Sequence, residues 1–255
     1  MDAAQLLSVY QILQSRIPKL HLTVFTRHGE VLRKQHPDIH TVPTAKLLEV
    51  FLQIKKSDLF IMVGGPFMES ATQMFSCAIL VTAAKVLGCP IISLGTTVFP
   101  YSTWWGNFLF RRIFNQIHVI TVRENVSQEI LAKLSVKPPV SMYGDPRYVL
   151  QPSGKREVND ILRQEGIHID RPIIGITLRH LHTQVPEWVK RSHGYTDAHV
   201  ENAYSVLAKA IDALSHNAQV VVIPMHPKHE EDVMVTQQIK RRIKNPDSLK
   251  IASRF

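Results

Sequence analysis

Hydrophobic positions along the chain switch repeatedly between helical and extended spacing. Leu6, Leu7, Tyr10 and Leu13 recur at helical spacing, and the run at residues 20–25 that follows is short and β-rich. The same alternation continues with helices expected at residues 45–54, 69–87, 104–117 and 125–134, and strands expected at residues 59–65, 90–96, 118–122 and 140–144. Because strands that alternate with helices form parallel sheets, this pattern predicts a doubly wound α/β fold.

A stretch rich in proline, glycine and charged residues divides the chain. Residues 147–171 hold one short amphipathic helix among such residues, which is typical of a connector. Beyond it the alternation resumes, with strands expected at residues 173–179, 219–225 and near Leu249, and helices at residues 197–215 and 230–243. We therefore predict two Rossmann-like lobes, residues 1–146 and 172–255, each built on a parallel sheet.

Both predicted lobes lack parts of a complete doubly wound sheet. The first opens on a helix where such a sheet usually opens on a strand, and the second has at most three strands. We expect the sequence to be a fragment, without an initial strand and without much of the second lobe. A complete, smaller domain is the alternative.

Charge and cysteine usage narrow the class of protein. Lys and Arg outnumber Asp and Glu by 30 to 21. This excess permits contact with nucleic acid or an anionic membrane, and it equally suits an enzyme that attracts a phosphorylated substrate. The sequence matches no nucleic-acid-binding motif, so we favour the substrate and expect no nucleic-acid partner.

Cys77 and Cys89 sit in apolar surroundings without the spacing of a zinc or redox pair, and we expect buried thiols in a reducing cytoplasm.

Candidate site residues lie at the carboxyl ends of the predicted strands or directly after them. Ligands of open parallel sheets lie outside the carboxyl ends of the strands, so these positions come first. They are Gly64, Gly65, Arg123, Asp145, Arg179 and His226.

Four of these candidates, the two glycines and the two arginines, have both a possible chemical role and a structural alternative. Gly64 and Gly65 would let the backbone approach an anion and point N–H groups at it, or they form a plain tight turn. Arg123 and Arg179 could clamp a carboxylate or phosphate in bidentate fashion, or form ordinary salt bridges. His226 could act as acid, base or phosphate donor.

Two further groups of residues carry weaker expectations. The spacing of His182, His193, His226 and His229 matches no known metal site, so we expect no metal and no cofactor. Trp104 and Trp105 begin a helix rich in phenylalanine. We expect them to pack in the core or between the lobes, with sugar stacking as the alternative.

The ordered strand-end motifs resemble the polysaccharide pyruvyl transferase family. The matching segments are VGGPFMES, LGCPIISLGTTV, HVITVRENVSQEILAKLSV and YGDP, followed by IIGITLR and QVVVIPMHPKHEED in the second lobe. The resemblance extends over nearly the whole chain. The family's opening strand and its later Arg-x-His segment have no counterpart, which is why we expect both ends of the catalytic domain to be missing.

The resemblance implies a two-lobe, glycosyltransferase-B-like architecture and a transferase reaction. Phosphoenolpyruvate would be the donor substrate, and two hydroxyls of one sugar in a polysaccharide or lipid-linked precursor would accept the pyruvyl group as a ketal. An enzyme of exopolysaccharide or cell-wall polysaccharide biosynthesis would act in the cytoplasm, at the inner face of the membrane. The alternatives are a sugar-nucleotide-dependent glycosyltransferase or epimerase of the same architecture, and a catalytically inert fragment.

The resemblance also assigns roles to residues of this sequence. Arg123 and Arg179 would bind the donor's anionic groups, with Asp145 also contacting substrate. Gly64 and Gly65 would supply backbone donors. Of the two remaining residues, His226 would transfer a proton or contact phosphate, and Asp2 would orient an acceptor hydroxyl.

Overall fold

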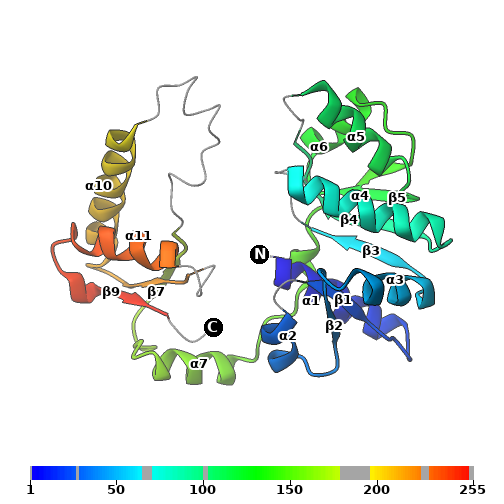
Figure 1. The fold of residues 1–255 in the computed structure, drawn as a ribbon. Helices are drawn as coiled ribbons and strands as arrows, with labels where there is room; N and C mark the ends of the chain where they lie inside the picture. The colour runs from blue at the N-terminus through cyan, green and yellow to red at the C-terminus, as the bar shows by residue number, and fades with distance from the viewer. Residues whose placement is uncertain are drawn as a thin grey trace. The chain divides into compact units, whose positions relative to one another are not determined.

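The structure of the chain is a computed structural model that describes residues 2–26, 29–64, 71–99, 103–178, 196–224 and 230–252. The chain divides into two compact units, Met1–Gln151 and Pro152–Phe255. Figure 1 shows the helices and strands of each unit.

The first unit contains two parallel sheets covered by helices. Strand β1 pairs with β2, and the second sheet has the order β3-β4-β5-β6. The strands are β1 (Thr23–Thr26), β2 (His40–Pro43), β3 (Phe60–Val63), β4 (Ile91–Thr96), β5 (Val119–Val122) and β6 (Val140–Met142). The helices are α1 (Asp2–Arg16), α2 (Gly29–Gln35), α3 (Leu47–Lys56), α4 (Ala71–Val86), α5 (Trp104–Phe114), α6 (Asn125–Lys133) and the 3-10 helix η1 (Pro146–Val149).

The second unit is built on one parallel sheet with the order β7-β8-β9. Its strands are β7 (Ile173–Ile176), β8 (Gln219–Val222) and β9 (Leu249–Ile251). Its helices are α7 (Lys155–Gln164), α10 (Asp197–Leu214), α11 (Glu230–Lys240) and the 3-10 helix η2 (Pro246–Ser248). The predicted α/β class with parallel, Rossmann-like sheets is confirmed in both units.

Two elements of the first unit were not expected from the sequence. Helix α2 has only seven residues, too few to display two turns of a clear amphipathic pattern. Strand β2 ends in a proline and buries only its two central residues, Thr41 and Val42. Both signals are too short for hydrophobic periodicity to distinguish them from a polar loop.

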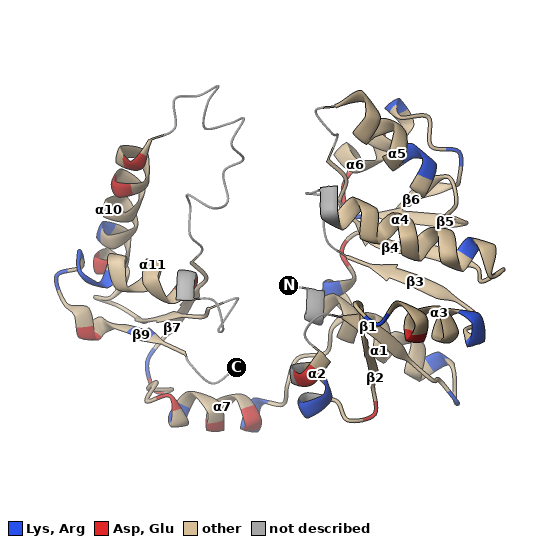
Figure 2. Ribbon diagram, in the orientation of Figure 1, with Lys and Arg blue, Asp and Glu red and all other residues tan. Residues whose placement is uncertain are grey.

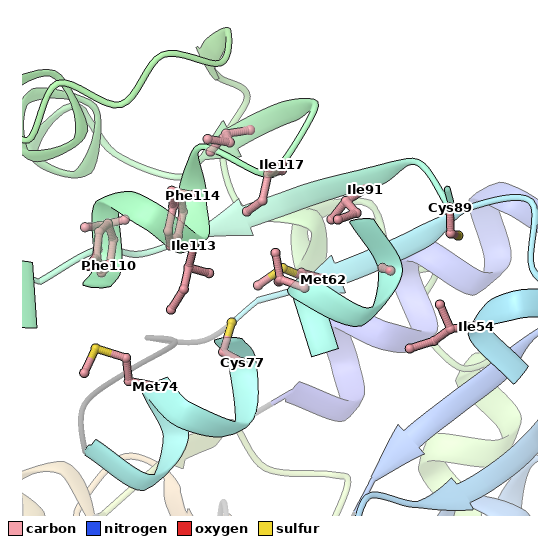
Figure 3. Packing of buried hydrophobic residues seen from close by; sticks show 14 of the residues in the cluster. Ile54, Met62, Met74, Cys77, Cys89, Ile91, Phe110, Ile113, Phe114 and Ile117 are labelled. Carbon is pink, nitrogen blue, oxygen red and sulfur yellow. The ribbon is translucent and has the colours of Figure 1, made fainter. Parts of the chain in front are cut away.

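The core of the first unit lies where helices α4 and α5 pack on β3 and β4. Figure 3 shows Met62, Ile91 and Phe114 among the side chains that meet there, all at most 5% exposed. The rings of Phe110 and Phe114 stack with centroids 4.3 Å apart. These two phenylalanines fill the interior from α5.

Trp104 corrects one expectation about this core. Trp104 is 81% exposed, because it lies in the first turn of α5 and not on the side of the helix that carries the buried residues. A core role for Trp104 is therefore wrong. Phe110, Ile113 and Phe114, further along the same helix, take the interior positions instead.

The two cysteines are buried, as expected. Burial raises the pKa of the Cys77 thiol to about 12, since the thiolate would lose its hydration in the core. Burial also raises the pKa of Cys89. Both thiols stay protonated at neutral pH and act as small hydrophobic side chains.

The segment predicted as a connector contributes to both units. Helix η1 packs against α1 in the first unit. Beyond η1, Leu162 and Ile167 pack with Val221 of β8 in the second unit. Residues 147–171 therefore include structural parts of each unit.

None of the described helices is long and apolar enough to cross a lipid bilayer.

Removing the Phe114 side chain tests the position of the core. Phe114→Ala should lower the free energy of unfolding by about 3–5 kcal/mol, because it leaves a cavity at a fully buried site. Trp104→Ala is the matched control on the same helix and should change it by at most about 0.5 kcal/mol. Urea unfolding followed by circular dichroism gives both values. Equal losses from the two variants would contradict this core.

Candidate functional site

Asp145 is the centre of a polar cluster at the carboxyl ends of the strands of the first unit. Its Oδ2 atom accepts hydrogen bonds from Arg123 Nη1 at 2.8 Å and from Arg147 Nη2 at 2.6 Å. Its Oδ1 atom accepts from Gln5 Nε2 at 3.1 Å and from the backbone N–H of Arg147 at 3.0 Å. The second Oδ1 bond caps η1, so one carboxylate joins α1, the end of β5 and η1.

The Asp145 carboxyl remains ionised over the whole physiological range. Burial by itself would raise its pKa, but hydrogen bonds from Arg147, Arg123 and Gln5 outweigh this effect. The result is a pKa held well below the usual range of an aspartate. The charge is therefore a permanent anchor for the two guanidinium groups.

Arg123 is positioned by the polar end of the neighbouring strand as well as by Asp145. It follows β5 directly, and its Nε donates to Thr97 Oγ1 at 2.8 Å. Its Nη2 donates to the same hydroxyl. Three of the five guanidinium N–H groups are thus used by described residues. With 15% of its side chain exposed, Arg123 is held rigidly and still reaches the surface of the unit.

Glu124 and Ser127 complete the support under Arg123. Glu124 lies 3.8 Å from Arg123 Nε and precedes the first turn of α6. Ser127 donates to the Glu124 carboxylate and accepts the backbone N–H of Val98 at 2.8 Å. The two carboxylates, Asp145 and Glu124, balance the charges of Arg123 and Arg147.

Gly64 is required by the close approach of α1. Its φ of +72° is a conformation that residues with a Cβ rarely adopt. A Cβ built on Gly64 would lie 1.7 Å from Gln5 Oε1. Gln5 is fully buried, and its Oε1 has no hydrogen-bond partner among the described residues. The glycine therefore lets the first turn of α1 reach both the end of β3 and Asp145.

A second glycine, Gly95 at the end of β4, does the same for η1. Its φ is +61°, and a Cβ there would lie 2.4 Å from Pro146 Cδ. Its backbone N–H donates to Thr121 Oγ1 at 2.9 Å. The close packing of Pro146 on Gly95 keeps Asp145 over the carboxyl ends of β4 and β5.

Three of the predicted site residues meet in this cluster, namely Gly64, Arg123 and Asp145. Arg123 and Asp145 bond to each other directly, and Gln5 links Asp145 to Gly64. Asp2 begins α1, but its side chain lies outside the described part of the structure. The remaining predicted residues, Gly65, Arg179 and His226, also lie outside the described residues.

The described residues include no group of three His, Cys, Asp or Glu side chains that could hold a metal ion. The four histidines considered above for metal binding, His182, His193, His226 and His229, lie outside the described residues.

The sequence interpretation missed three members of the cluster: Gln5, Thr97 and Arg147. Thr97 lies inside the recognised motif LGCPIISLGTTV but was given no role, and Arg147 directly follows the motif YGDP, so a window one residue wider would have included it. Gln5 carried no such signal. It is a polar residue within a helical pattern, and only the tertiary structure brings it to Asp145, 140 residues away along the chain.

Comparison with known protein families shows to which family the chain belongs. The family model described as "Polysaccharide pyruvyl transferase" matches residues 2–249 of the 255. The chain belongs to the polysaccharide pyruvyl transferase family. A search of curated proteins gave no match. The predicted enzyme class, a transferase that acts on polysaccharide, is confirmed at the level of the family.

Family membership gives the cluster a functional setting. In this polysaccharide pyruvyl transferase, the strand ends of the first unit present two guanidinium groups that are fixed by carboxylates. Such preorganised cations bind carboxylate or phosphate groups without a cost for ordering the side chains.

Substituting Gly64 tests the contact with α1. Gly64→Ala should lower the free energy of unfolding by about 2–4 kcal/mol, because the new methyl group is strained and meets buried Gln5. Gly88→Ala is the matched control: its φ is +74°, and a Cβ there meets nothing within 4 Å. It should cost only about 1 kcal/mol. Equal losses in chemical denaturation would exclude steric contact with Gln5.

The charge of Asp145 should make stability depend on acidity. A depressed pKa contributes stability that is complete above the unfolded-state pKa of about 3.9 and is lost as pH falls further. The difference in unfolding free energy between the natural chain and Asp145→Asn should thus be largest above about pH 5 and shrink below about pH 4.

Asp160→Asn is the control for this measurement, since Asp160 bonds Arg163 at an exposed position. Its substitution should change the unfolding free energy by at most about 1 kcal/mol at any pH. A gap between the natural chain and Asp145→Asn that stays constant with pH would contradict an ionised, hydrogen-bonded Asp145.

Proposed function

We propose that this transferase moves the pyruvyl group of phosphoenolpyruvate to two hydroxyls of one sugar residue, in a polysaccharide or its lipid-linked precursor. The product is a cyclic pyruvate ketal. The observation that carries the proposal is the pair Arg123 and Arg147, anchored on Asp145 at the strand ends of a polysaccharide pyruvyl transferase. Such an acceptor places the reaction in the cytoplasm, at the inner face of the membrane.

The donor chemistry suits this pair of arginines. Phosphoenolpyruvate carries a carboxylate and a phosphate on adjacent positions, and its binding requires cations for both. Arg123 has two N–H groups beyond those bonded to described residues, and the Arg147 side chain is 35% exposed. In this proposal these N–H groups contact the donor, while Asp145, Thr97 and Glu124 hold Arg123 in place.

The remaining roles follow the family resemblance. Arg179 is proposed as a second anion clamp. Gly65 is proposed to approach the donor with its backbone, because the N–H of Gly64 already donates to the carbonyl oxygen of Leu94 at 3.0 Å. His226 is the proposed proton-transfer or phosphate-contacting residue. Asp2, at the start of α1, is proposed to orient an acceptor hydroxyl.

The proposed reaction balances in two additions. A general acid protonates the methylene carbon of phosphoenolpyruvate, which places oxocarbenium character on C2. One sugar hydroxyl attacks C2 and loses its proton, and the C2–O bond to phosphate breaks. The second hydroxyl then attacks the same carbon and loses its proton, so that inorganic phosphate and the ketal are the products.

Donor identity is tested by what the enzyme releases. The chain should release inorganic phosphate from phosphoenolpyruvate only when a glycan acceptor is present, and the acceptor should gain the mass of a pyruvate ketal. Release of nucleotide from a sugar nucleotide would contradict this proposal and indicate a glycosyltransferase instead. No turnover with either donor would favour an inert fragment.

Arg123→Ala tests the anion site. Relative to the natural chain, kcat/KM for phosphoenolpyruvate should fall by the equivalent of about 2–5 kcal/mol, as expected when one partner of a desolvated charge pair is removed. Arg163→Ala removes an arginine from an exposed ion pair on α7 and should leave kcat/KM unchanged. Unchanged turnover in Arg123→Ala would exclude its role at the anion site.

A further inference from the structure

Helix α4 is apolar on two sides, although the sheet covers only one of them. Its inner side carries Met74, Val81 and Ala84, which are all fully buried. Its outer side carries Phe75 and Val86, which are 53% and 79% exposed. Although Ser76 and Thr82 are also exposed on this helix, an amphipathic surface helix ordinarily turns its apolar side chains toward the core and not toward water.

The exposed apolar surface continues from α4 onto α3. The two helices pack side by side, and an open groove of about 570 Å³ lies along them. Phe51 of α3 and Phe75, Ile79 and Val86 of α4 contribute to its lining. Leu48 lies three residues before Phe51 in α3 and is 75% exposed.

We call this surface the outer α3–α4 face and define it by the exposed apolar residues Leu48, Leu52, Phe75, Ile79 and Val86. Groups of exposed apolar side chains on a protein surface mark sites of interaction with a protein or a membrane.

Basic residues accompany the outer α3–α4 face. Lys55 and Lys56 occupy the last turn of α3, and Lys85 occupies the last turn of α4. The neighbouring α5, which packs beside α4, adds Arg111 and Arg112 in its last turn. Helices α4 and α5 contain no acidic residue, and Figure 2 shows blue without red along both.

This arrangement distinguishes the face from an ordinary helix surface. On α10 of the second unit, exposed Glu201 and Lys209 mix both signs of charge with the apolar positions. The outer α3–α4 face instead combines apolar side chains with an excess of cations, since Glu49 is the one acidic residue of α3 and α4 and it pairs with Lys46. Apolar contact and positive charge together match the surface of a membrane that contains anionic lipids, where each nearby Lys or Arg strengthens binding.

We propose that the outer α3–α4 face docks on an anionic membrane surface, with Phe75, Ile79 and Val86 entering the interfacial layer and Lys55, Lys56 and Lys85 contacting lipid phosphates. A second copy of the chain fits less well, because a symmetric contact would place two surfaces with the same excess of positive charge against each other. The proposal goes beyond the donor chemistry, and it would hold the transferase at the surface where a lipid-anchored acceptor lies.

The test is co-sedimentation of the purified chain with vesicles, without donor or acceptor. Vesicles of mixed phosphatidylcholine and phosphatidylglycerol should bind the chain, and vesicles of phosphatidylcholine alone should bind it far more weakly. Binding should weaken as salt rises, because exposed charges are screened. Since no turnover is measured, this result is separate from the outcome for phosphoenolpyruvate.

Two sets of variants locate the contact. The double variant Phe75→Glu, Ile79→Glu should reduce the partition coefficient between anionic vesicles and water by about a hundredfold. The control Val206→Glu, at an exposed position of α10, should reduce it by less than about threefold. Lys55→Gln with Lys56→Gln and Lys85→Gln should reduce it by about a hundredfold as well. The charge-matched control is Lys155→Gln with Arg156→Gln and Lys209→Gln, in the second unit. Circular dichroism and thermal unfolding verify that each variant is folded, and Leu48→Glu with Val86→Glu replaces the first pair if it is not.

Four results would overturn the proposal. They are no binding to the anionic vesicles, equal binding to phosphatidylcholine alone, equal losses from the charge variants of both units, and a concentration-dependent dimer that Phe75→Glu abolishes. The last would assign the face to a second copy of the chain.

Discussion

The first unit depends on one largely buried carboxylate, the side chain of Asp145, of which 9% is exposed. Asp145 binds the guanidinium groups of Arg123 and Arg147 and the amide of Gln5, so that segments up to 140 residues apart are tied at one point. A buried carboxylate in an apolar interior would be costly. Here four hydrogen bonds compensate for the lost hydration, and the charge persists. The position of α1, the rotamer of Arg123 and the start of η1 all follow from it.

Two glycines make this arrangement sterically possible. Gly64 admits Gln5 at the end of β3, and Gly95 admits Pro146 at the end of β4. Both have positive φ angles: Gly64 directly follows β3, and Gly95 lies at the irregularity between Ser93 and Thr96 in β4. The glycine-bearing strand ends are thus used for close packing of α1 and η1 around Asp145. A ligand at this edge would meet a surface whose charged groups are already fixed.

The same unit combines a hydrogen-bonded polar cluster at the strand ends with a helix, α4, whose apolar outer side is incompletely covered. The inner side of α4 packs on the sheet through Met74, Cys77 and Val81. Its outer side leaves Phe75 and Val86 exposed, close to lysines in the last turns of α3 and α4. In the two proposals made above, these features serve different partners: the polar cluster would bind a small anion, and the apolar helix pair would dock on a lipid surface.

The sequence by itself determined the parallel α/β class, the order of nearly all strands and helices, and the family. These rest on hydrophobic periodicity and on motifs that are local in the chain, and residues 2–249 match the family accordingly. It also placed Gly64, Arg123 and Asp145 at strand ends, because parallel strands bring their carboxyl ends to one edge. Tertiary structure alone decided that Arg123 is bound by Asp145 and Thr97, that Gln5 belongs to the cluster, and that Trp104 is exposed. Such pairings depend on distances between segments far apart in the chain, which no local pattern encodes.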